Sequence, residues 1–362
     1  MGSVARVAPR LPAQDRASPD IARAQRSGHN AAGTTQRAEP ALHPISAAAG
    51  GRAPTVYGGW MQLGFAVPVS GSWATPSNCA EIARRAEALG YSSLWTFQRL
   101  LSPLDGDRPV LAPQYRRVHD PLATMAYLAG LTTTVRLGVA VVNMPYYAPI
   151  VLAKLLTTID HQSAGRLDVG LGIGWSPDEF AAVGTPYDRR GARAEDYLRC
   201  LNAIWTDDVV DYEGDFYRVP RSRVDPKPLQ RPHPPVLMGG AAAPALRRAG
   251  RLADGWISSS QADLAHIDDS IRTVCDAARD AGRDPHRLRF VCRGVVKVRT
   301  GERGPLTGSF DDIRADLADL AAKNVTETFV DLNFDPEIGS PDADPAASMR
   351  HAHEVLEALA PG

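Results

Sequence analysis

The sequence predicts an α/β protein built as a (β/α)8 TIM barrel. From residue 61 onward, apolar strand patterns alternate with amphipathic helix patterns, which is typical of a parallel sheet. The alternation gives eight strands in about 300 residues, the size of a closed barrel with insertions. The first strand is followed by Pro68-Val69-Ser70-Gly71-Ser72-Trp73. That loop lacks the glycine fingerprint of the competing open, doubly wound sheet.

Each element is expected from its residue pattern and its boundary residues. The expected strands cover 61–67, 92–97, 135–142, 166–173, 235–238, 255–259, 288–298 and 327–332. The expected helices cover 76–89, 120–131, 149–162, 190–205, 244–252, 264–281, 310–323 and 346–359. Asp120 is a predicted N-cap, followed by a proline that fits the first helical turn. A small hairpin insertion is expected over 209–219, turning at Glu213-Gly214-Asp215.

Composition excludes several classes of protein. The formal net charge of the 362 residues is -1, so nothing points to nucleic acid or to an anionic membrane. No apolar run approaches the roughly 20 residues that span a bilayer. The four cysteines, Cys79, Cys200, Cys275 and Cys292, are widely spaced. We expect free thiols in a reducing compartment, the cytoplasm, with neither a disulfide framework nor a metal site.

The first 60 residues differ from the rest. They contain no lysine and only three acids, and no period of 2 or 3.6 persists. Their Arg-rich composition is also found in organelle transit peptides. We favour a simpler hypothesis, in which residues 1–60 are a disordered tail or a mis-called extension, and the natural start is Met61. The predicted barrel domain then covers 61–362.

Two glycine-bearing strand ends are candidate ligand sites. The segment GRLDVGLGIGW, 165–175, becomes glycine-rich at its carboxyl end, at Gly170, Gly172 and Gly174, before Trp175. Glycines there allow a flat ligand to approach the backbone, or they only satisfy packing inside the barrel. In the segment 234–249 a strand ends at Gly239-Gly240 before a helix. Free N–H groups at such a turn bind anions, although tight strand-to-helix turns are common.

Polar residues at other strand ends are further candidates. Asn143 follows the third strand and is either a site residue or a turn-forming Asn. Arg99 follows the second strand, where an apolar run ends. Arg189, Arg190 and Arg193 begin the helix 190–205, where the helix dipole disfavours positive charge. That mismatch indicates an anionic ligand, or pairing with Glu195 or Asp196.

Taken in order, these segments resemble the luciferase-like monooxygenase superfamily, and more narrowly its actinobacterial class of coenzyme F420-dependent oxidoreductases. The residues that carry the resemblance are LGFAVPVSG from Leu63, ARRAEALGYSSLWT from Ala83, DPLATMAYLAGLTTTVRLGVAVV from Asp120, APIVLAKLLTTIDHQSAGRLDVGLGIGWSPDEF from Ala148, and PPVLMGGAAAPALRRAGRLADGWI from Pro234. The resemblance runs from Met61 to about Leu332. It implies a luciferase-like barrel that binds a deazaflavin or flavin at the carboxyl ends of its strands.

The resemblance also implies roles for individual residues. A non-proline cis peptide that backs the cofactor ring falls at Ala140-Val141. The ring pocket then includes Asn143, Gly172, Gly174 and Trp175, and backbone amides at Gly239, Gly240 and Ala241 hold the cofactor phosphate. Trp73, Phe97 and Trp175 are expected as apolar walls that place the substrate.

One departure bears on the reaction. Sugar-phosphate dehydrogenases of this superfamily have a histidine where this chain has Arg99 and a glutamate where it has Trp175. Arginine is not a base at neutral pH, so the resemblance does not extend to alcohol oxidation. Arg99 and Trp175 are the candidate catalytic residues. Arg99 either binds an anionic group or stabilises the reduced ring, or it pairs structurally with an acid such as Asp105 or Asp120.

Three functions remain open at this point. The leading one is an F420-dependent oxidoreductase that transfers a hydride between the deazaflavin and an unidentified small organic substrate. The first alternative is an FMN-dependent luciferase-like monooxygenase that uses reduced flavin and O2. The second is a non-catalytic barrel that binds flavin or deazaflavin. The resemblance implies a homodimer.

Overall fold

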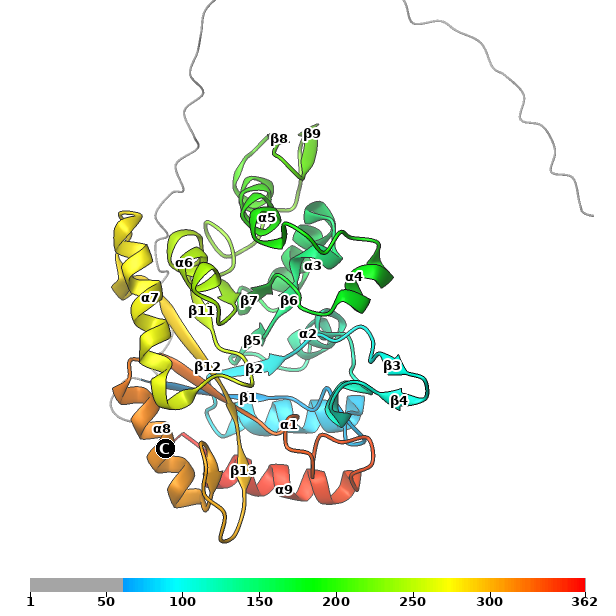
Figure 1. Ribbon diagram of the computed structural model, residues 1–362, viewed down its shortest axis with the longest axis vertical. Helices are drawn as coiled ribbons and strands as arrows, with labels where there is room; N and C mark the ends of the chain where they lie inside the picture. The colour runs from blue at the N-terminus through cyan, green and yellow to red at the C-terminus, as the bar shows by residue number, and fades with distance from the viewer. Residues whose placement is uncertain (1–60, 362) are drawn as a thin grey trace, which may run out of the picture. The chain divides into compact units, whose positions relative to one another are not determined.

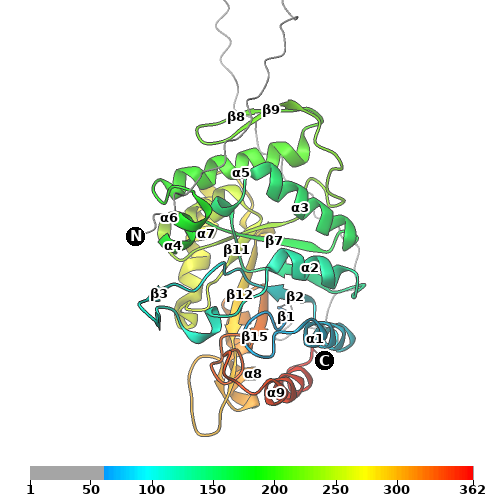
Figure 2. The same cartoon turned by 90° about the vertical axis from the view of Figure 1, so that its right-hand side faces the viewer.

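The predicted barrel is present in the computed structural model of the protein, which describes residues 61–361. Strands lie in the middle and helices surround them (Figures 1 and 2). The barrel strands are β1 Gln62–Ala66, β2 Ser93–Thr96, β5 Arg136–Val139, β7 Leu167–Gly172, β10 Val236–Gly239, β11 Gly255–Ile257, β12 Arg289–Val295 and β15 Glu327–Asp331. The prediction for residues 1–60 lies outside the described residues.

The sheet closes on itself through parallel pairs. β10 pairs with β11 on one side and with β7 on the other, where Met238 lies opposite Leu171. β15 pairs with β12 and with β1, so the last strand meets the first. This closure leaves no sheet edge among the eight barrel strands and brings all their carboxyl ends to one mouth.

Helices between the strands cover the outside of the barrel. They are α1 Pro76–Ala88, α2 Pro121–Ala129, α3 Pro149–Gln162, α4 Pro177–Val183, α5 Arg190–Thr206, α6 Ala243–Leu252, α7 Ile267–Asp280, α8 Phe310–Ala322 and α9 Pro345–Ala358. The predicted N-cap of α2 is confirmed, because the Asp120 carboxylate accepts from the Ala123 N–H at 2.9 Å. The predicted hairpin insertion is also present, as β8 Val210–Glu213 and β9 Arg218–Ser222.

Three features differ from the predicted elements. The third strand stops at Val139 and resumes as β6 Val142–Asn143, after a cis peptide bond at Ala140-Val141. The strand predicted to end at 298 ends at Val295. The next residues form β13 Lys297–Val298, which pairs with β14 Thr307–Gly308. The hairpin of β3 Leu104–Asp105 and β4 Arg108–Pro109 was not predicted, and neither was α4. These pieces are too short for a hydrophobic period to show.

The cysteines and the helices bear on two further predictions. All four cysteines are free, and three of them are buried, as predicted. Burial raises the pKa of the Cys79, Cys200 and Cys292 thiols to about 12, so none is a ready nucleophile. Between residues 61 and 361, no helix is both long and apolar enough to cross a bilayer.

Inside the barrel, side chains from alternate strand positions fill the space in layers. Trp95 stacks on Phe329 with ring centroids 5.0 Å apart, and both lie in an interior apolar cluster with Leu237 and Val291. The neighbouring strand makes room for this stack. A Cβ at Gly138 would lie 2.5 Å from the Trp95 ring, so only glycine fits there.

A charged network closes the barrel at the amino ends of the strands. The Asp168 carboxylate is fully buried and accepts hydrogen bonds from Arg136 at 2.6 Å and Arg289 at 2.7 Å. Arg289 also bonds to Glu327 at 2.9 Å. Burial alone would raise the pKa of Asp168, but the two guanidinium groups outweigh burial and hold that pKa well below its usual range. Asp168 therefore stays charged in the folded protein.

We expect Asp168→Asn to destabilise the fold by about 3–5 kcal/mol at pH 7, because it leaves two half-buried cations short of a counter-charge. The folded-state pKa of Asp168 is depressed. Its stabilisation is therefore present above the unfolded-state pKa of about 4 and is lost as pH falls through the folded value. Urea unfolding at pH 7 and at about pH 3 should show the difference between wild type and variant shrinking at the lower pH.

The matched control is Asp319→Asn, which removes an exposed acid that pairs with Lys323 on α8. It should change the free energy of unfolding by less than about 1 kcal/mol. An equal loss of stability from both substitutions would contradict the proposed role of Asp168.

Candidate active site at the barrel mouth

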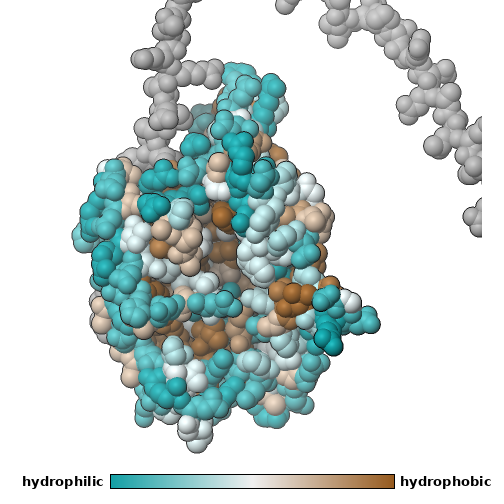
Figure 3. All heavy atoms as spheres, viewed as in Figure 1, coloured by the Kyte–Doolittle hydropathy of each residue, from teal (hydrophilic) through white to brown (hydrophobic). Residues whose placement is uncertain are grey.

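The mouth formed by the carboxyl ends of the strands is the candidate site. On the face drawn in Figure 3, apolar atoms lie inside a hollow in the region of β6 and β7, and polar residues surround it. In characterised barrel enzymes the active site lies at this end.

The break in the third strand shapes one wall of the mouth. The Ala140-Val141 bond is cis, as the resemblance predicts. The Val141 side chain lies between two glycines, because a Cβ at Gly172 would come within 2.5 Å of it and a Cβ at Gly239 within 3.0 Å. The space at Gly172 is also limited by Asn143, whose Oδ1 lies 2.9 Å from that position. These glycines therefore make room for Val141, which favours the packing interpretation of Gly172.

Arg99 is buried and paired, but not with Asp105 or Asp120. Its Nη1 lies 3.2 Å from Glu179 Oε2, and the two side chains are 3% and 1% exposed. The Glu179 carboxylate also accepts from the Leu100 N–H at 2.7 Å and from the Tyr146 hydroxyl at 2.8 Å. Glu179 thus joins the end of β2, the turn after β6 and the helix α4.

Aromatic rings surround this ion pair. The Arg99 guanidinium lies 4.4 Å from the centre of the Trp175 ring and 5.0 Å from that of Tyr115. Trp175 is half exposed at the rim, and its role as a wall stays a prediction. Trp73 does not meet the prediction of a pocket wall, because its side chain is fully buried in the main hydrophobic cluster and exposes no surface.

The hydroxyl of Tyr146 is an acid that stays protonated. Burial raises its pKa first, and the hydrogen bond to the charged Glu179 raises it further, to well above the usual range. Gly174 explains why this arrangement fits. It has φ +72°, and a Cβ there would meet the ring of Phe180 at 2.6 Å. Only glycine allows α4 to bring Glu179 this close.

A second buried arginine was missed by sequence reasoning. Arg293 of β12 donates from Nε to Asp331 at 2.6 Å and from Nη1 to the Ala140 carbonyl at 3.3 Å. Its guanidinium lies 4.0 Å from the centre of the Phe334 ring and 4.9 Å from that of Phe97. Phe97 is 3% exposed and packs in the main hydrophobic cluster, so its role as a wall stays a prediction. The available signal for Arg293 was a charge in the middle of the strand, on the same face as the buried Val291.

The turn after β10 supplies free donors. The helix α6 begins at Ala243 without a side-chain cap, and the N–H groups of Ala241, Ala242 and Ala243 have no hydrogen-bond partner within residues 61–361. Gly240 has φ +135°, and a Cβ there would lie 2.7 Å from the Ala245 Cβ. A glycine-bent turn with free amides at a helix start has the donor set that a phosphate needs.

The three arginines at the start of α5 lie without a carboxylate partner among the described residues. Arg190 donates to the Gly174 carbonyl at 2.7 Å, and Arg189 and Arg193 face the Phe216 ring. The acids that the sequence suggested as partners are engaged elsewhere. Glu195 pairs with Arg248 and Arg251 of α6, and Asp196 accepts from Tyr212 and from two backbone N–H groups.

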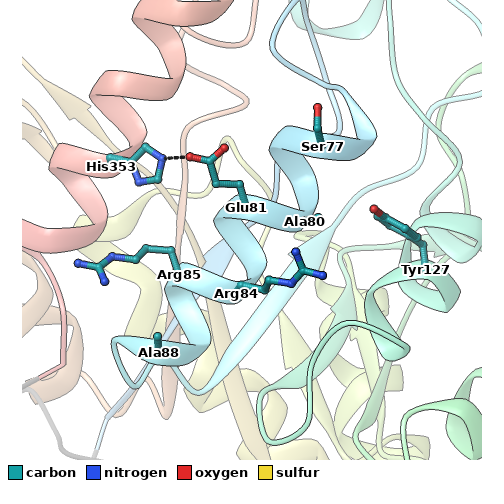
Figure 4. A pocket seen from close by; sticks show the side chains of 8 residues that line it. All are labelled: Ser77, Ala80, Glu81, Arg84, Arg85, Ala88, Tyr127 and His353. Carbon is teal, nitrogen blue, oxygen red and sulfur yellow. Dashed lines mark hydrogen bonds and ion pairs between the residues drawn. The ribbon is translucent and has the colours of Figure 1, made fainter.

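A groove of about 740 Å³ lies elsewhere, on the outer surface of α1 (Figure 4). Arg84 and Glu81 of α1 line it between Tyr127 of α2 and His353 of α9, and His353 is bonded to Glu81 at 2.7 Å. It contains no strand end. In the described part of the chain, no group of three or more His, Cys, Asp or Glu side chains is placed to hold a metal ion.

The fold defines a (β/α)8-barrel protein, and the mouth at the carboxyl ends of its strands is its candidate site. A model of the luciferase-like monooxygenase family matches residues 57–303, and the chain belongs to this family. An uncharacterised protein of Mycobacterium tuberculosis is 34% identical over 286 residues, which cover 73% of this chain and 98% of that protein.

Two further similar proteins are named for different cofactors. An FMNH2-dependent dimethylsulfone monooxygenase of Pseudomonas putida is 31% identical over 208 residues, which cover 57% of this chain and 54% of that protein. The structure of an F420-dependent secondary alcohol dehydrogenase in complex with an F420–acetone adduct matches with a TM-score of 0.66 at 16% identity. The match covers 83% of this chain and 99% of that one, and it shows the shared fold.

We expect Arg99 and Glu179 to be energetically coupled. Arg99→Met and Glu179→Gln should each lower the free energy of unfolding by about 3–5 kcal/mol, because each leaves a buried charge alone. The double variant should lose less than the sum of the two, since it removes both charges. Urea unfolding at pH 7 measures all four states of this cycle.

The exposed pair Arg272–Asp269 on α7 is the control for this cycle. Its coupling should be under about 1 kcal/mol. Additive losses at Arg99 and Glu179 would show that the two side chains stabilise the mouth independently.

Proposed function

We propose that this protein is an F420-dependent oxidoreductase, which transfers a hydride between the deazaflavin and a small organic substrate. The observation that carries the proposal is the combination of two donor sets at one mouth. The free amides of 241–243 suit a phosphate. The unpaired arginines at the start of α5 suit the further carboxylates of a polyanionic tail. F420 carries both kinds of anion in its tail, whereas FMN carries one phosphate.

The residues present fit a planar ring as well. Ala140, Val141 and Phe97 offer apolar surface, and Arg293 offers a guanidinium beside the Ala140 carbonyl. When bound, F420 supplies the hydride chemistry of its central ring. The protein then binds the tail at the rim, orients the ring against β6, and excludes water with Trp175, Tyr115 and Phe334.

The reaction we propose is not the oxidation of a sugar phosphate. Arg99 and Trp175 stand where such enzymes have their histidine and glutamate, and Arg99 is committed to Glu179. A reduction of an activated C=C or C=O bond fits a mouth with aromatic walls and no free base at position 99. The homodimer stays a prediction.

The second candidate is an FMN-dependent monooxygenase, and one observation favours it. The Pseudomonas putida relative, whose name states that it depends on FMNH2, is 31% identical to this chain. Titration of the purified protein with F420H2 and with FMNH2 under anaerobic conditions separates the two. We expect saturable binding of F420H2 at lower concentration. Binding of FMNH2 alone would reject the proposal.

A substitution at the turn after β10 tests the phosphate site. Ala241→Asp should weaken F420 binding at least tenfold, because a carboxylate beside the free amides repels the phosphate. The neutral, similarly sized Ala241→Asn is the control and should bind nearly as well as wild type. The deazaflavin chromophore without its phosphate tail should bind both variants equally, as measured by fluorescence titration. If Ala241→Asp weakened the binding of this tail-free chromophore as much as the binding of F420, the phosphate would bind elsewhere.

A further inference from the structure

Arg293 and Arg99 both place a guanidinium at the mouth, but their surroundings differ. Arg99 is at the rim. Its guanidinium lies beside the rings of Trp175 and Tyr115, and its Nε and Nη1 are enclosed and make no hydrogen bond within the described residues, although Nη1 lies 3.2 Å from Glu179 Oε2. Its counter-charge, Glu179, is fixed against it by Leu100 and Tyr146. Arg99 thus holds the rim together.

Arg293 instead projects inside the barrel toward the break in the third strand. Val291, two residues before it on β12, lies in the interior cluster, so alternation points Arg293 inward as well. Its Nη1 bonds to the carbonyl of Ala140, the first residue of that break. Arg293 is only about 7% exposed, its Nε and Nη1 are engaged, and its Nη2 makes no hydrogen bond within residues 61–361.

The counter-charge of Arg293 is held away from the mouth. Asp331 is fully buried, and its Oδ1 accepts from the backbone N–H of Asn333 at 2.9 Å and from its Nδ2 at 3.0 Å. Asn333 is itself fixed by the first loop, since its Oδ1 accepts from the N–H groups of Val69 and Ser70. The carboxylate cannot turn toward the mouth without breaking these bonds. The pair is therefore a fixed dipole with its positive end at the Ala140 carbonyl.

We propose that Arg293 is the cofactor-tuning residue of this protein, which stabilises the negative charge that the bound ring gains on reduction. The inference rests on the proposed function. A hydride carries two electrons and one proton, so its arrival adds one negative charge to the ring and oxidises the substrate by two electrons. Its departure reverses both changes. A fixed cation beside the ring favours the reduced form over the oxidised form. Arg99 pairs with Glu179 at the rim and not with the strand break that backs the ring, so we expect it not to discriminate between them.

The test compares the affinities of the two forms of F420. For wild type, Arg293→Met, Arg293→Gln, Arg293→Lys and Arg99→Met, the dissociation constants of F420 and F420H2 are measured anaerobically by absorbance and fluorescence titration. We expect the Met and Gln variants at 293 to weaken F420H2 binding at least tenfold more than F420 binding. A tenfold selective loss equals about 30 mV in a two-electron potential, which spectroelectrochemistry measures separately.

The control variants are expected to keep the preference for the reduced form. Arg293→Lys keeps the charge and should recover most of the preference for the reduced form. Arg99→Met should change both dissociation constants by the same factor. Thermal unfolding shows which variants are folded. Arg293→Gln, which keeps a donor for the Ala140 carbonyl, serves if Arg293→Met does not fold.

The outcomes separate this inference from the proposed function. Equal weakening of both forms in the folded charge-removing variants, or no change, overturns the role of Arg293 while F420 binding by wild type still supports the proposed function. If wild type binds FMN and not F420, the proposed function fails. The dissociation constants of FMN and FMNH2, compared between wild type and the variants at position 293, then decide the role of Arg293. If wild type binds neither cofactor, both proposals fail.

Discussion

The buried carboxylate of Asp168 is the constraint on which the geometry of the barrel depends. It accepts from Arg136 at the start of β5 and from Arg289 at the start of β12, two strands that are not neighbours in the sheet. Their amino ends are therefore tied across the interior. Because parallel strands have a fixed rise per residue, tying one end also sets where the other end lies. The positions of Ala140 and Arg293 at the mouth follow from that anchor.

Two independent networks then organise the mouth. One centres on Glu179 and joins the ends of the second, third and fourth barrel strands through Leu100, Tyr146 and α4. The other runs from the first loop through Asn333, Asp331 and Arg293 to Ala140. In each network a buried carboxylate is fully engaged by donors, as a charge in a low dielectric must be. The mouth is thus preorganised by the protein itself, before any ligand enters.

The alternation of strand and helix patterns was sufficient to predict the barrel, because each long element carries its own period. It failed where elements are short, as at α4 and at the β3–β4 hairpin. Within the site, the resemblance placed the cis bond correctly at Ala140-Val141, whereas the phosphate site at Gly239-Gly240 stays a prediction. The site was not predictable where residues far apart in the chain meet. Nothing in the sequence around Asp178-Glu179 indicates that Glu179 reaches Arg99.

The same limit explains why sequence reasoning considered charge control at Arg99. Arg99 stands out in the sequence because it ends an apolar strand, and because the resemblance to sugar-phosphate dehydrogenases implies a histidine at that position. Arg293 lies inside a strand, where an inward charge has no visible partner until β15 brings Asp331 beside it. A buried arginine is tolerated only with such a partner, so the pair must be satisfied by the fold before it serves a ligand. At the rim, Arg99 pairs with Glu179 and lies beside two aromatic rings. Inside the barrel, Arg293 pairs with Asp331 and bonds to the Ala140 carbonyl at the break in the third strand, so the two arginines differ in where their charge lies and not in whether it is paired.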